Sequence, residues 1–203
     1  MPNKIISGLK SFGIKIFRRI TRFERRQPVL DLIEPGFICA EIGVWRGDLS
    51  KKILKKSPSF LHLIDPWVFM PEFTDTVYGK RNGNSQDLMD RIYQEVCQEF
   101  NGIEGVQIHR KSSLEAVRSF EDEYFDWVYL DGNHHYEYVR NDLEAYIPKV
   151  KSGGYITGDD YRYDRCQKGG PEKAVKELIR EGSIVLIKIQ NNQFILRKSG
   201  QKN

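Results

Sequence analysis

From residue 36 onward, the chain alternates short apolar stretches typical of buried strands with amphipathic stretches typical of helices. The expected strands cover residues 36–44, 60–67, 106–110, 125–132 and 153–161, and helical periodicity follows each of them. The chain then ends in two strands joined by an Asn-containing turn at 190–193, which predicts a hairpin. This order predicts an α/β fold: a doubly wound, mostly parallel seven-stranded sheet with a C-terminal β-hairpin.

Length and composition agree with one soluble domain. A chain of 203 residues is long enough to bury a sizeable core, and no apolar run approaches the length of a membrane span. The three cysteines, Cys39, Cys97 and Cys166, are scattered and form no C-x-x-C pair. They indicate reduced thiols in a cytoplasmic protein, and they argue against both a disulfide framework and a zinc site.

The N-terminal segment differs from the rest of the chain in charge. Residues 1–26 carry a net charge of +7, whereas the remaining residues sum to −3, which disfavours nucleic-acid binding by the main domain. One helical stripe collects the apolar side chains Ile5, Leu9, Phe12, Ile16, Ile20 and Phe23. We therefore divide the chain into a basic amphipathic helix at 1–30 and a domain at 31–203.

Three roles are open for this basic helix. It could dock on the domain as a lid or on a second subunit of a homo-oligomer. It could lie on an anionic membrane surface through residues 1–26, which would make a cytoplasmic protein peripheral at a membrane. It could also serve as a nucleic-acid arm. The pattern argues against a secretory signal, because charges interrupt every candidate apolar core.

The turn after the first strand has the features of a ligand-binding loop. Glu41-x-Gly43-x-x-x-Gly47 opens the first helix, and glycines let the backbone turn tightly beside a ligand. Asp65 ends the second strand, where an acidic side chain can hold ribose hydroxyls. The G-x-G-x-x-G fingerprint of nicotinamide enzymes is missing, and an ordinary strand–helix turn is the alternative interpretation.

The stretch "EIGVWRG" resembles the first motif of the class I S-adenosylmethionine-dependent methyltransferases, and the terminal hairpin is similar to that family's last two strands. A narrower resemblance is to bacterial small-molecule O-methyltransferases, including the macrocin-type sugar O-methyltransferases. It covers about residues 36–198 through "EIGVWRGDLSKKIL", "LIDPW", "KSSLEAV", "FDWVYLDGNHHYEYVRNDLEAYIPKVKSGGYITGDDY" and "GGPEKAVKEL". The resemblance implies a Rossmann-like class I methyltransferase fold and S-adenosylmethionine as cofactor. The acceptor would be a hydroxyl of a small polar molecule, either sugar-like or a natural product.

The resemblance also implies residue roles around the cofactor. Glu41, Gly43 and Gly47 would line its methionine part, and Asp65 would bind the ribose. Trp67 would pack near the adenine, and Ser112 and Ser113 would face the adenine side. A core aromatic is the alternative role for Trp67, and a helix cap is the alternative for the serines.

Three acidic residues lie at the ends of two neighbouring strands. Asp131 ends the fourth strand, and Asp159 and Asp160 end the fifth, so their carboxylates should converge at one edge of the sheet. Such a group suits a hard divalent cation such as Mg²⁺. In the macrocin-type branch the matching acids bind a metal, which implies a magnesium site. The alternative is that Asp131 and Asp160 cap helices while Asp159 is solvated.

The adjacent histidines follow Asp131 directly. The D-G-x-H pattern of the family places its histidine at His134, where a neutral imidazole could act as general base beside Asp131. A structural histidine is the alternative for His134, and His135 fits the start of the helix. The long segments 68–86 and 159–170 could cover the acceptor.

Two other classes of function are open. A nucleic-acid methyltransferase could use the basic N-terminus as an anchor, although the chain has no N-P-P-Y tetrad. A non-catalytic binding module could keep the cofactor fold, although the retained motif residues argue against it. We therefore expect a small-molecule acceptor and no nucleic acid.

Overall fold

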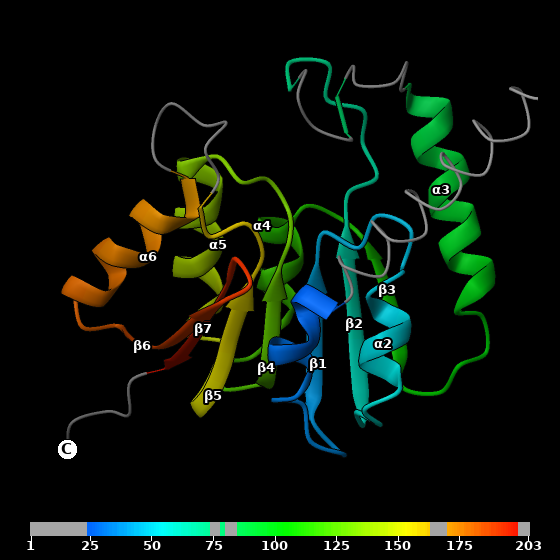
Figure 1. The fold of residues 1–203 in the computed structure, drawn as a ribbon. Coiled ribbons are helices and arrows are strands. Elements are labelled where there is room, and N and C mark those ends of the chain that lie inside the picture. Colours follow the sequence, from blue (N-terminus) through cyan, green and yellow to red (C-terminus); the bar gives the residue numbers. More distant parts are fainter. Residues whose placement is uncertain (1–23, 74–77, 80–84, 163–169, 199–203) are drawn as a thin grey trace, which may run out of the picture.

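A single seven-stranded sheet organises the molecule, in the order β3-β2-β1-β4-β5-β7-β6 (Figure 1). The computed structural model describes residues 24–73, 78–79, 85–162 and 170–198. The strands are β1 (Ile38–Ile42), β2 (Phe60–Asp65), β3 (Val106–Arg110), β4 (Phe125–Leu130), β5 (Val150–Gly158), β6 (Ile184–Gln190) and β7 (Gln193–Lys198). All neighbours from β3 to β5 pair in parallel, and β7 pairs antiparallel with both β5 and β6.

Helices cover both faces of the sheet. They are α2 (Ser50–Leu54), α3 (Gln86–Glu99), α4 (Ser113–Ala116) with the 3-10 turn η2 (Val117–Ser119), α5 (Tyr136–Tyr146) and α6 (Gly170–Arg180). One core joins α4, α5 and α6 to one face of the sheet, and a second core joins residues 29–33, α2 and α3 to the other. The side chains of β4 alternate between them: Val128 belongs to the first core and Tyr129 to the second.

Local sequence explains where the helices lie. The buried side chains of α3, Met89, Ile92 and Val96, are spaced by threes and fours, and the Ser85 side chain accepts a hydrogen bond from the Leu88 N–H. Past the end of α6, Gly182 adopts a φ of +79°, a conformation that glycine adopts at little cost. These features were readable in the sequence, and the predicted α/β fold is confirmed.

The order of the strands places a crevice between β1 and β4. The chain runs outward from β1 through β2 to β3, then returns to the other side of β1 for β4 and β5. Ligands of doubly wound sheets bind at such a reversal, beyond the carboxyl ends of the strands. The predicted site residues of the loops after β1, β2, β4 and β5 all lie at this edge.

The predicted division at residue 30 falls within a packed segment. Residues 24–30 are helical, and Val29, Leu30 and Ile33 are buried in the second core. The stripe from Ile5 to Phe23 lies outside the described residues. In the part of the chain that the structure describes, no helix combines the length and apolar character needed to span a bilayer.

Candidate functional site

Backbone hydrogen bonds hold the loops at the carboxyl edge of the sheet together. The Asp131 N–H donates to the Ile42 carbonyl at 2.8 Å, and the Asp159 N–H donates to the Leu130 carbonyl at 3.0 Å. On the other side of β1, the Gly43 N–H donates to the Ile64 carbonyl at 2.9 Å. The first residues after β1, β4 and β5 therefore form one continuous edge with the end of β2.

A cavity opens at this edge beside β1 and β2. Its volume is about 120 Å³. Four of the predicted cofactor residues line it: Gly43, Asp65, Ser112 and Ser113. The remaining lining residues are Ile42, Ile64, Pro66, Met70, Phe73, Tyr78, Gly132, Asn133, Tyr138 and Asp142.

Gly43 is required by the close approach of two loops. Its φ is +89°, and a Cβ added there would lie 2.2 Å from the carbonyl oxygen of Asp131. A larger residue would therefore push the turn after β1 away from the turn after β4. The glycine lets both turns border the same cavity.

Asp65 presents a buried carboxylate to the cavity. Its oxygens accept hydrogen bonds from the backbone N–H groups of Trp45, at 3.0 Å, and Trp67, at 2.7 Å. The hydroxyl of Tyr78 also donates to Asp65. Burial raises the pKa of Asp65, and these hydrogen bonds oppose that effect. The bond from Tyr78, which sequence reasoning did not anticipate, demonstrates that this carboxylate can accept a hydroxyl.

Three predicted cofactor residues do not line the cavity. Glu41 is 1% exposed and accepts a hydrogen bond from Ser50 Oγ at 2.5 Å, and burial raises its pKa to about 8. A Cβ on Gly47 would lie 2.6 Å from the Phe100 ring, so this glycine serves helix packing. Trp67 is fully buried in the second core, which agrees with the alternative of a core aromatic.

Ser112 and Ser113 both line the cavity, and Ser112 also has the alternative role of helix cap. Ser112 caps α4 in a capping box with Glu115, and it also lines the cavity. Ser113 donates a hydrogen bond to Asp142, a buried carboxyl on α5 that sequence reasoning missed. Burial raises the pKa of Asp142 to about 6. The sequence could have indicated that Asp142 is buried, because it lies three residues after the buried Val139 on the same face of the helix.

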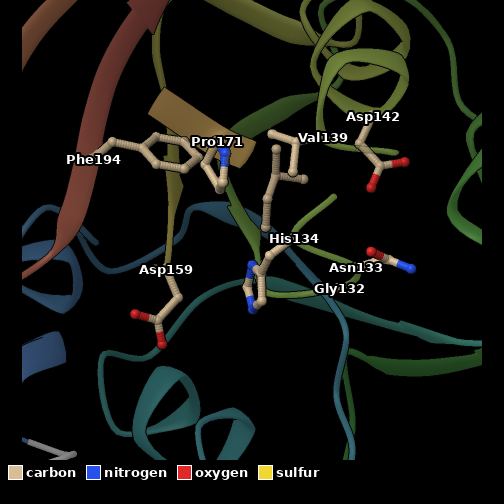
Figure 2. A pocket seen from close by; sticks show the side chains of 9 residues that line it. Gly132, Asn133, His134, Val139, Asp142, Asp159, Pro171 and Phe194 are labelled. Carbon is tan, nitrogen blue, oxygen red and sulfur yellow. The ribbon is translucent and has the colours of Figure 1, made fainter. Parts of the chain in front are cut away.

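His134 lines a second, smaller pocket (Figure 2). This pocket adjoins the cavity, because Gly132, Asn133 and Asp142 line both spaces. The Nε2 atom of His134 lies 3.7 Å from an Asp131 oxygen and 3.7 Å from an Asp160 oxygen. His134 is thus flanked by two carboxylates in the pocket that adjoins the cavity.

His135 has a different environment. It is the N-cap residue of α5, and its ring packs against Phe73 at a centroid distance of 5.3 Å. Its backbone N–H donates to the Asn133 side chain at 2.9 Å. This placement agrees with the expected structural role at the start of the helix.

The acidic edge meets an arginine from the N-terminal segment. Arg26 is 5% exposed, and its Nη2 donates both to Asp131 and, at 2.8 Å, to Asp159. The other Asp159 oxygen accepts from Gln193 and from the Asp160 N–H. Burial would lower the pKa of Arg26, but the neighbouring negative groups, Asp131 foremost, raise it well above its ordinary value.

The arrangement of the three acids does not support the predicted magnesium site. Across residues 24–73, 78–79, 85–162 and 170–198, no three His, Cys, Asp or Glu side chains form a group that could hold a metal ion. Asp131 and Asp159 converge as expected, but a guanidinium lies between them, and Asp160 accepts instead from Asn192 at 3.2 Å. The donor set therefore does not fit a divalent cation. Sequence reasoning missed Arg26 because it belonged to a run of basic residues.

Comparison with known protein families identifies a match for this chain. The family model described as "Methyltransferase domain" matches residues 40–161, more than half of the chain. Among curated proteins, none matches. The matched segment contains Gly43, Asp65, Asp131, His134 and Asp159 but not Arg26.

Solved structures share the fold at low identity. A putative rRNA-methylase from Clostridium thermocellum has a TM-score of 0.61 at 10% identity, covering 89% of this chain and 96% of that one. The O-methyltransferase NovP has a TM-score of 0.57 at 22% identity, covering 89% and 81%. A Burkholderia thailandensis 1,6-didemethyltoxoflavin-N1-methyltransferase, solved with its acceptor and S-adenosylhomocysteine, has a TM-score of 0.54 at 12% identity, covering 98% and 91%.

Proposed function

Because this chain belongs to the family of methyltransferase domains, we propose that it transfers the methyl group of S-adenosylmethionine to a hydroxyl of a small polar acceptor. One observation carries the proposal. The cavity that presents Asp65 adjoins the pocket that contains His134, and three residues line both spaces. A cofactor in the first space would therefore lie beside His134.

The residues of the cavity fit the cofactor. Asp65 already accepts a hydrogen bond from the Tyr78 hydroxyl, and a ribose hydroxyl would take the same position. Gly43 and Gly132 line the cavity with backbone atoms alone. Because they have no side chains, they leave room for the methionine part of the cofactor. When bound, S-adenosylmethionine supplies a sulfonium methyl group that is open to nucleophilic attack.

His134 is the proposed general base. Its neutral imidazole would accept the proton of the acceptor hydroxyl while that oxygen forms its bond to the methyl group and the bond from methyl carbon to sulfur breaks. Asp131 and Asp160 lie 3.7 Å from its Nε2 and would stabilise the imidazolium that forms. The proposed reaction thus needs no divalent cation between Asp131 and Asp159, where Arg26 lies.

The class of acceptor follows from the resemblance to macrocin-type O-methyltransferases, and we propose a sugar-like or natural-product hydroxyl. Residues 27–203 carry a net charge of −3, which disfavours binding of a phosphate backbone, so we propose no nucleic-acid acceptor. We also propose that the protein is cytoplasmic. In this proposal residues 1–26 contact either a membrane surface or a second subunit. Sedimentation with anionic vesicles and size-exclusion chromatography distinguish these two arrangements.

Calorimetry with S-adenosylhomocysteine tests the cofactor. We expect a Kd in the micromolar range, about −8 kcal/mol, and no competition by NAD. Asp65→Asn should weaken binding roughly 10- to 100-fold, because a hydrogen bond to a charged acceptor is replaced by one to a neutral amide. The matched control is Asp90→Asn on α3, a carboxylate that does not line the cavity and should leave the Kd unchanged. Binding of NAD without binding of S-adenosylhomocysteine would refute the methyltransferase assignment.

A further inference from the structure

The buried carboxylate of Asp159 and the partly buried carboxylate of Asp131 share one guanidinium group at the acidic edge. Arg26 Nη2 lies between Asp131 Oδ2 and Asp159 Oδ2, and Arg26 Nε also donates to Asp159 Oδ2 at 3.3 Å. The guanidinium carbon lies 5.5 Å from the centre of the Tyr129 ring. Since Arg26 is 5% exposed and Asp159 3% exposed, this cation is an interior part of the site.

The same two oxygens would be the first ligands of a divalent cation. A metal needs carboxylate oxygens at roughly 2.0–2.6 Å, and the hydrogen-bonded guanidinium occupies that space. Two carboxylates held this close without a counter-charge would cost several kcal/mol in desolvation and repulsion. Arg26 supplies the positive charge as a fixed, permanently protonated group.

We propose that Arg26 takes the place of the divalent cation in this enzyme: a resident guanidinium holds Asp131 and Asp159 together and makes the site independent of metal. Arg26 lies outside residues 40–161, the segment that the family model matches. The segment around residue 26 therefore contributes a side chain to a site whose Asp131, His134 and Asp159 belong to the matched segment.

The guanidinium acts through Asp131. One Asp131 oxygen is bonded to Arg26, which turns the other toward His134 at 3.7 Å. Arg26 is accordingly a positioning residue, and its role in methyl transfer rests on the proposed function. Its role as a substitute for a metal does not, because cation binding can be measured without turnover.

Binding of Mn²⁺, followed by electron paramagnetic resonance, tests the substitution. The wild-type protein should bind no Mn²⁺ at micromolar concentrations, because the guanidinium repels the ion and occupies its ligands. Arg26→Ala should gain one Mn²⁺ per chain, since two carboxylates then lack a counter-charge. The double variant with Arg26→Ala and Asp159→Asn should lose this gain.

Arg25 provides the matched control. It is the preceding residue with the same charge, but its side chain is 47% exposed and only approaches Asp159 at 4.0 Å. Arg25→Ala should therefore bind no Mn²⁺. If Arg25→Ala gains the ion as well, net charge explains the effect and the proposal is wrong.

A thermal measurement gives a second readout. Mg²⁺ at 100 times its Kd should shift the folding equilibrium of Arg26→Ala by about 100-fold and leave that of the wild type unchanged. Arg26→Gln, which keeps much of the side-chain volume, serves if the alanine variant does not fold. Stoichiometric Mn²⁺ binding by the wild type, or folded Arg26 variants that bind none, would overturn the proposal.

Loss of S-adenosylhomocysteine binding is a separate result. It would refute the proposed function while leaving the test of cation substitution valid. The two failures are thus distinguishable.

Discussion

At the scale of single residues, the two adjacent histidines have opposite environments. His134 lies between the carboxylates of Asp131 and Asp160, whereas His135 starts α5 and packs on Phe73. From the sequence we expect a general base at His134 and a structural residue at His135. The contacts of His135 agree with its expected role, and the base role of His134 stays a prediction.

Substitution of each histidine should separate the roles. His134→Ala should slow turnover by roughly 10²–10⁴-fold, the usual contribution of a positioned base, with the Kd for S-adenosylhomocysteine unchanged. His135→Ala should lower turnover far less. The measurement is release of S-adenosylhomocysteine in the presence of a panel of sugar and phenolic acceptors. Equal loss in both variants, with a lower Tm in both, would show that His134 is structural as well.

At the scale of elements, the turn after β1 is shaped by its neighbour after β4. Gly43 and Gly36 both have φ near +90°, but a Cβ on Gly43 would meet Asp131 backbone at 2.2 Å and a Cβ on Gly36 would meet nothing within 4 Å. Backbone conformation alone thus predicts equal effects at the two glycines. Packing predicts different ones.

Alanine at each glycine makes the comparison direct. Gly36→Ala should cost about 1–2 kcal/mol of unfolding free energy, the penalty of a left-handed alanine. Gly43→Ala should cost more and should also weaken S-adenosylhomocysteine binding, because the turns after β1 and β4 must separate. Urea unfolding and calorimetry measure the two effects. If both variants lose the same unfolding free energy and bind S-adenosylhomocysteine equally well, the turns adjust without widening the cavity.

At the scale of the whole molecule, Glu41 links stability to pH. Its carboxyl is buried between the sheet and α2, and burial raises its pKa from 4.5 in the unfolded chain to about 8. The folded state therefore binds this proton more tightly. The resulting stabilisation is complete below pH 4.5, declines as pH rises and is lost above about pH 8.

Glu41→Gln tests this dependence, because glutamine resembles the protonated acid and does not titrate. The unfolding free energy of the variant relative to the wild type should rise from pH 5 to pH 8 by a few kcal/mol. Chemical denaturation at a series of pH values measures the difference. Glu104→Gln, at an exposed carboxylate, should show no such trend. A constant difference for Glu41→Gln across this range would contradict the raised pKa.

The sequence by itself determined the fold and the edge of the sheet at which the site lies. Strand and helix periodicities are local properties, and parallel order brings every strand's carboxyl end to one edge. Gly43, Asp65, Asp131 and His134 could therefore be placed there before any coordinates were known. The spacing of α5 could also have revealed Asp142.

Only the tertiary structure decided what these side chains contact. Arg26 is 105 residues from Asp131 and 133 from Asp159 along the chain, and no local pattern marks one arginine of a basic run as buried. Glu41 likewise matched a ligand motif, yet it is buried against Ser50. The partner of a buried charge depends on which distant segment packs against it. Burial away from water is tolerated only where the fold brings an opposite charge into contact. For this reason the sequence predicted a magnesium site at the three acids, whereas in the folded protein an arginine forms ion pairs with two of them.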